Sequence, residues 1–181
     1  MNDDSDIDSF SFSSIEHDEN DFASDKTEDH YLEQYRIYLH IFNSTNDRRQ
    51  HSNEFFLGLN TVIMGILGYV EGKSVASESS ILVLVPLVGI GICICWYKII
   101  SSYTQINRSK FKVIHKLERK LPVPLFEAEW ELLGKGRDAR KYIPLSVIEK
   151  HIPVIFAILY MIIFIINFPW NYLINLINSL I

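Results

Sequence analysis

Three stretches of the chain are apolar enough to cross a lipid bilayer. The clearest is Ile81–Ile100, whose only charged residue, Lys98, lies near its far end. About 20 residues of α-helix rise about 30 Å, which is the thickness of the hydrocarbon core. A shorter run, Phe55–Val70, precedes this stretch, and a third, Ile152–Phe168, follows it. The pattern predicts an all-α membrane protein with three transmembrane helices and a helical cytoplasmic domain.

An amphipathic pattern precedes the first apolar run. Glu28 and Asp29 favour a helix start near Thr27, because negative charge stabilises the first turn of a helix. The polar segment 43–46 either breaks this helix or forms a polar patch within a longer one. We expect the aromatic stripe of the helix to pack on another helix; its residues are Tyr31, Leu32, Tyr35, Tyr38, Leu39 and Phe42.

Helical spacing of apolar residues continues beyond the second apolar run. One helix is therefore predicted from about Ile81 to Leu121, where Pro122 and Pro124 end it. A short acidic and aromatic helix, Leu125–Leu133, follows, with Gly134 as its C-terminal cap.

A separate short segment precedes the third apolar run. Pro144–His151 is predicted as a short interfacial helix, with Pro153 bending the chain into the span. After the span, the uncharged tail 171–181 places its aliphatic residues on one side and its asparagines on the other. This tail suits the far membrane interface.

Basic residues are distributed unevenly along the chain. Residues 101–151 contain eleven Lys or Arg, against one in 71–80 and none in 171–181. Lys and Arg in short loops favour the cytoplasmic side. We therefore predict that the N-terminus and 101–151 are cytoplasmic, and that the C-terminus lies outside.

The N-terminal region is strongly acidic, with twelve Asp or Glu and one Lys in residues 1–33. It has too few apolar residues to offset the entropy of folding, which favours disorder. Phe10–Ile15 is a candidate motif for docking on the basic surface at 108–120 or on another protein.

These patterns divide the chain into six segments: an acidic arm (1–29), a cytoplasmic amphipathic helix (30–54), a transmembrane hairpin (55–100), a basic cytoplasmic helical domain (101–151), a third transmembrane helix (152–170) and an amphipathic tail (171–181).

The candidate functional residues are those expected to form contacts between helices. Small residues let helix backbones approach closely in lipid. The predicted oligomer interface therefore combines glycines of the first span with apolar residues of the cytoplasmic helices: Tyr31, Tyr35, Tyr38, Phe42, Gly58, Gly65, Ile114 and Leu117. Asn60 lies within the first span, where it forms an interhelical hydrogen bond or lines a pore.

No pattern typical of an active site is found. Cys93 and Cys95 lie two residues apart in an apolar helix, which does not make a metal site. The six histidines include no close metal-binding pair, and GKGRDAR at 134–140 lacks the spacing of a phosphate loop. We predict no enzyme activity, cofactor or metal. Anionic lipid headgroups explain the basic stripe better than nucleic acid does; it contains Arg108, Lys110, Lys112 and Lys116.

The chain resembles the RipA-family octameric membrane proteins, a bacterial family of small integral membrane proteins. The resemblance covers roughly residues 30–168. It is carried by YLEQYRIYLHIFNSTNDRRQHSNEFFLGLNT, by WYKIISSYTQINRSKFKVIHKLERKLPVPLFEAEW and by the Tyr142–Pro153 lead. It implies a homo-octamer in the inner membrane without an assigned enzymatic activity. More loosely, Tyr31–Asn60 and the paired spans look like the SLATT effector modules, which are thought to form pores; the third span departs from that group.

Two functions of different classes follow from these observations. The first is a non-enzymatic, homo-oligomeric scaffold of the inner membrane, structural or regulatory in role. The second is a gated pore or channel, such as a SLATT-like defence effector, with Asn60 and the glycine stripe of the first span near the permeation path.

Overall fold

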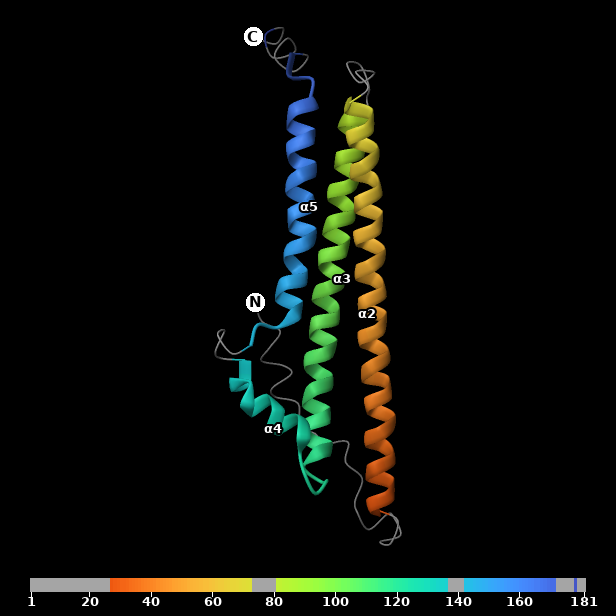
Figure 1. Ribbon diagram of the computed structural model, residues 1–181, viewed down its shortest axis with the longest axis vertical. Coiled ribbons are helices and arrows are strands. Elements are labelled where there is room, and N and C mark those ends of the chain that lie inside the picture. Colours follow the sequence, from red (N-terminus) through yellow and green to blue (C-terminus); the bar gives the residue numbers. More distant parts are fainter. Residues whose placement is uncertain (1–26, 73–80, 137–141, 172–177, 179–181) are drawn as a thin grey trace. The chain divides into compact units, whose positions relative to one another are not determined.

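The structure is a computed structural model that describes residues 27–72, 81–136, 142–171 and 178. Within these ranges every regular element is helical (Figure 1): α2 (Thr27–Gly72), α3 (Ile81–Glu118), α4 (Leu125–Leu132), the 3₁₀ turn η4 (Gly134–Gly136) and α5 (Leu145–Asn167). The predictions for the acidic arm up to residue 26, the turn at 73–80 and nearly all of the tail lie outside the described residues.

Three of these helices confirm the predicted spans. α2, α3 and α5 are each long and apolar enough to cross a membrane. Only 11%, 28% and 11% of the residues in their most apolar windows are buried within the chain. Most apolar side chains of the spans therefore face lipid or another polypeptide, as expected for a membrane protein.

The long helices pass through the polar segments that interrupt their apolar patterns. α2 starts at Thr27 as predicted and continues through 43–46 without a break. There Thr45 donates a hydrogen bond to the carbonyl of Ile41, so this polar side chain is satisfied on its own helix. α3 extends well beyond its apolar run and ends at Glu118, three residues before the predicted Leu121.

α4 begins directly after Pro124 and ends at Leu132, one residue before the predicted Leu133. Its C-cap residue is Leu133 and not the predicted Gly134. Gly134 follows the cap with a φ of 71°, a backbone conformation that glycine adopts readily.

α5 differs from its prediction in one respect. The short helix expected at Pro144–His151 is continuous with the third span, and Pro144 is its N-cap residue, with a φ of −56°. The fixed φ of proline is compatible with a helix start. Pro153 lies buried within the helix, where packing on neighbouring helices holds the chain in place despite the missing N–H.

The chain divides into two compact units. Unit 1 includes α2 up to Asp47, α3 from Tyr103 and the segment through α4 to Ile143. Unit 2 includes α2 from Arg48, α3 up to Ser102 and all of α5. The three apolar runs therefore all belong to unit 2.

The core of unit 2 lies where its three helices meet. Leu67 of α2, Leu82 and Cys93 of α3, and Tyr160 of α5 are buried together. Trp96 adds a second layer, because its ring stacks on Phe56 at 5.8 Å between ring centres. A three-helix bundle thus exists within a single chain.

Gly89 allows α3 and α5 to approach closely. A Cβ atom added at Gly89 would lie 2.6 Å from Cζ of Tyr160 and 2.7 Å from its two Cε atoms. The Tyr160 ring is fully buried, so it has no free space to move into. No larger residue fits at this position without displacement of the α5 helix or the ring.

We expect Gly89→Ala to destabilise unit 2 by about 1–3 kcal/mol, because overpacking forces the ring or a helix to shift. The measurement is the thermal unfolding of the detergent-solubilised protein. Gly91→Ala is the matched control on the same helix, since a Cβ there meets nothing within 4 Å. Equal unfolding temperatures for the two variants would contradict the close contact at Gly89.

Candidate functional surfaces

Asn60 forms the polar centre of unit 2. Its side chain is fully buried, and its amide nitrogen donates to the carbonyl of Phe56 at 2.7 Å. Its Oδ1 accepts a hydrogen bond from the hydroxyl of Tyr160 at 3.1 Å and one from the thiol of Cys93 at 3.4 Å. Asn60 therefore links all three helices, and within one chain it lines no open path.

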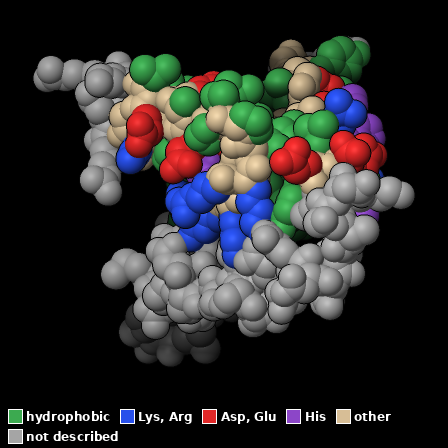
Figure 2. Space-filling model, turned by 90° about the horizontal axis from the view of Figure 1, so that it is seen from below, with side chains coloured by type: hydrophobic (Ala, Val, Ile, Leu, Met, Phe, Trp, Pro, Cys, Tyr) green, Lys and Arg blue, Asp and Glu red, His purple; other side chains and the backbone are tan. Residues whose placement is uncertain are grey.

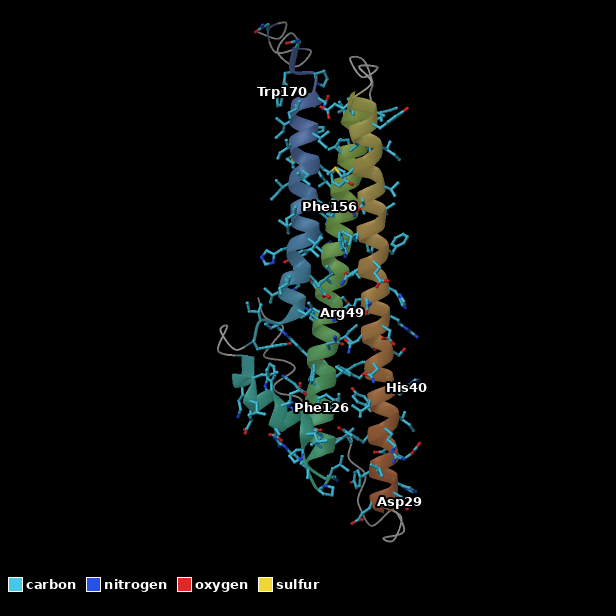
Figure 3. All side chains as sticks on the ribbon, viewed as in Figure 1. Asp29, His40, Arg49, Phe126, Phe156 and Trp170 are labelled. Atoms are coloured by element: carbon cyan, nitrogen blue, oxygen red, sulfur yellow. The ribbon has the colours of Figure 1, made fainter. Side chains whose placement is uncertain are left out.

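An ion pair also joins α2 to α5 in unit 2. Nη1 of Arg49 lies 3.2 Å from a carboxylate oxygen of Glu149, and both side chains are mostly buried. Figure 3 labels Arg49 on α2. The pair was not predicted from the sequence, because its two residues are 100 positions apart. The only local signal was a charged residue just before an apolar run.

Aromatic side chains accompany this ion pair. The indole N–H of Trp96 donates to Oδ1 of Asn53 at 2.9 Å. The ammonium of Lys150 lies 5.8 Å from the ring centre of Tyr97. Such groups, with an apolar body and a polar end, are typical of the boundary between lipid and water.

Glu118 is the polar centre of unit 1. It is the last residue of α3, and it is almost fully buried. Its carboxylate accepts hydrogen bonds from the backbone N–H of Phe126 at 3.0 Å and of Glu127 at 3.2 Å, and from the hydroxyl of Tyr35 at 2.9 Å. One side chain thus caps α4, which has no side-chain cap at Pro124, and binds α2.

Two tyrosines of the predicted stripe have altered pKa values. Burial, together with the hydrogen bond to Glu118 and its negative charge, raises the pKa of Tyr35 to about 12. Burial also raises the pKa of Tyr38. Tyr35 therefore donates its hydrogen bond to Glu118 as a neutral hydroxyl at physiological pH.

An aromatic series packs the helices of unit 1 together. The rings of Phe42 and Phe111 lie 5.1 Å apart, edge to face, and Phe111 in turn lies 6.3 Å from Phe126. This series runs from α2 through α3 to α4. Ile114 is also fully buried on α3.

The predicted basic stripe divides into two groups. Arg108, Lys112 and Lys116 follow one another at intervals of one helical turn on α3. Lys110 instead extends to α2, where its ammonium lies 3.2 Å from the carbonyl of Ile41 and contacts Thr45. Figure 2 shows Lys and Arg side chains gathered on one face of the structure, beside hydrophobic and acidic side chains.

The predicted interface residues fall into two classes. Phe42 and Ile114 are buried by the helices of their own chain, Tyr35 is bound to Glu118, and Tyr31 lies under the ammonium of Lys120. In contrast, a Cβ added at Gly58 or Gly65 would meet nothing within 4 Å. Tyr38 and Leu117 are half-buried.

The glycine face of α2 is therefore open. Gly58, Thr61, Gly65, Gly68 and Gly72 recur at steps of three and four, and each is exposed. Residues with this spacing share one side of a helix. Another helix could approach this side closely.

The described residues hold no group of three or more His, Cys, Asp or Glu side chains that could bind a metal ion.

Three apolar helices of sufficient length define a multi-pass helical membrane protein. The model of the octameric membrane protein family matches residues 32–169, which is more than half of the chain. The chain therefore belongs to this family. Comparison with curated proteins and with solved structures found no match.

We expect Glu118→Gln to loosen α4, because an amide cannot accept all the hydrogen bonds that the carboxylate accepts. The loss should be about 1–3 kcal/mol, the cost of leaving buried donors unpaired. Hydrogen exchange at the amides of Phe126 and Glu127 should become faster. Glu131→Gln, at an exposed position of α4, is the control. Unchanged exchange in Glu118→Gln would rule out the cap.

Proposed function

We propose that this protein is a non-enzymatic homo-octamer of the bacterial inner membrane, and that it acts as a structural or regulatory scaffold. The family description, which refers to octameric membrane proteins and covers residues 32–169, carries the proposal. The narrower likeness to RipA proteins is part of the proposal and rests on the sequence segments quoted above.

The exposed surface of unit 2 supports association within the membrane. The glycine face of α2 is open, and close approach of helix backbones is a principal source of helix association in lipid. In this proposal Gly58 and Gly65 contact a span of a neighbouring subunit. Tyr38 and Leu117, which are half-buried, are less available to a second copy.

The absence of enzyme activity is also a proposal. Among the described residues the buried polar or charged side chains are Asn60 and Glu118, and both are engaged in contacts between helices. Groups used in this way hold the fold together, which favours a structural role over a catalytic one. Arg108, Lys112 and Lys116 are proposed to contact anionic lipid headgroups.

The pore hypothesis placed Asn60 near a permeation path. In the structure Asn60 is fully buried and its oxygen accepts hydrogen bonds from two neighbouring helices. The observed contacts therefore favour the scaffold over the gated pore.

We predict that the detergent-solubilised protein has the mass of eight copies of the 21.1 kDa chain, about 170 kDa of protein. Eight copies are expected because the chain belongs to a family described as octameric. Native mass spectrometry measures this mass after removal of the detergent. A monomer or dimer at all protein concentrations would contradict the proposal.

We also predict the orientation from the positive-inside rule. In a variant with Cys93→Ser and Cys95→Ala, a membrane-impermeant maleimide added to intact bacteria should label Glu71→Cys and not Lys135→Cys. After cell lysis both positions should react. Labelling of Lys135→Cys in intact cells would reverse the proposed topology.

A further inference from the structure

The described residues of unit 1 leave an apolar surface of α4 uncovered. Leu125 and Leu132 lie two helical turns apart on one face, and they are 66% and 81% exposed. Glu129 lies between them on the same face and is also exposed. An adjacent side of α4 already packs on α3 through Phe126. We call Leu125, Glu129 and Leu132 the α4 face.

Unit 1 exposes a second apolar surface on α2. Ile37 and Ile41 lie one turn apart and are 51% and 46% exposed. Arg36 and His40 form an exposed row beside them, and Figure 3 shows His40 directed away from α3. We call these four residues the α2 face.

The two faces lie on different sides of unit 1. α3 packs against α2 through Phe42 and Phe111, and against α4 through Phe111 and Phe126. Within unit 1, Figure 1 shows α2 and α4 on either side of α3. A closed ring requires such an arrangement, because each subunit must present two different surfaces to its two neighbours.

The charges of the two faces are complementary. The α4 face carries the carboxylate of Glu129, for which the described residues provide no ion pair. The α2 face carries the guanidinium of Arg36, with Glu33 about one turn before Ile37. Opposite charges beside two apolar rows favour one orientation of the contact.

We propose that the α4 face of one subunit docks on the α2 face of the next, head to tail, outside the three apolar runs. This docking rests on the proposed homo-oligomer, and it identifies the surfaces of unit 1 through which neighbouring subunits meet. A membrane surface is a poorer occupant for the α4 face. α4 carries three glutamates and no basic residue, and anionic lipids repel it.

The test is cross-linking between subunits of the full-length protein. Leu132→Cys and Ile41→Cys are combined in a chain that also carries Cys93→Ser, which keeps a hydrogen-bond donor at position 93, and Cys95→Ala. A short bis-maleimide should then join neighbouring copies into a ladder of sizes up to the full ring on a denaturing gel. Each single-cysteine chain should remain a monomer on the same gel.

The outcomes separate this inference from the proposed function. A complex of octameric mass that yields no ladder overturns the head-to-tail contact and leaves the homo-oligomer intact. Dimers formed by Leu132→Cys alone would also overturn it, because they indicate that α4 meets α4. If the protein is monomeric before cross-linking, the proposal of a homo-oligomer is itself wrong.

Exchange of charges provides a second test with its own control. Glu129→Arg should lower the fraction of full-size complex several-fold in detergent, and adding Arg36→Glu should restore it. Ile106→Ser, which replaces another exposed apolar residue of unit 1 outside both faces, should leave the mass unchanged. Failure of Arg36→Glu to restore the complex would overturn the proposed pairing of the charges.

Discussion

The arrangement of unit 1 depends on one buried carboxylate. Removing a charged group from water costs several kcal/mol unless hydrogen bonds replace the lost hydration. Glu118 obtains them from two backbone amides of α4 and from the hydroxyl of Tyr35. These partners are available only because α3 ends at Glu118 and α4 begins seven residues later. The position of α4, and therefore the direction of its exposed leucines, follows from satisfying this carboxylate.

In unit 2 a buried polar side chain also needs hydrogen bonds, here in apolar surroundings. Asn60 is the only fully buried amide among the described residues, and two neighbouring helices supply donors to its oxygen. Because water is absent from the hydrocarbon core, an unpaired amide there would destabilise the bundle. The hydrogen bonds of Asn60 and the close contact at Gly89 both involve Tyr160, so they fix how α5 packs on α3. Each unit is thus organised around one satisfied polar side chain.

Local signals in the sequence predicted most of the helices and few of the contacts. The starts of α2 at Thr27 and of α4 after Pro124 are local features and lie where the pattern placed them, whereas α3 ends at Glu118, before the predicted Leu121. Tyr35 lies 83 residues from Glu118, and Arg49 and Asn60 each lie 100 residues from their partners on α5, so no periodicity identifies these contacts.

The tyrosine stripe illustrates a related limit. Helical spacing shows that one face of α2 is buried, but it does not show whether the same chain or another copy covers that face. In the structure Phe42 packs on Phe111 and Tyr35 bonds to Glu118, so α3 covers much of the face. Surfaces that remain open in a single chain are better indicators of association than a periodic pattern.

These open surfaces differ between the two units. Apolar side chains of unit 2 gain little from association by hydrophobicity alone, because lipid is as apolar as a neighbouring helix. In the proposed topology unit 1 lies in water, where burying an exposed leucine or isoleucine is worth about 1–2 kcal/mol. The α4 and α2 faces contribute four such side chains to each contact. In this arrangement association would be driven mainly from unit 1, and the open glycine face of α2 would determine how closely the spans approach.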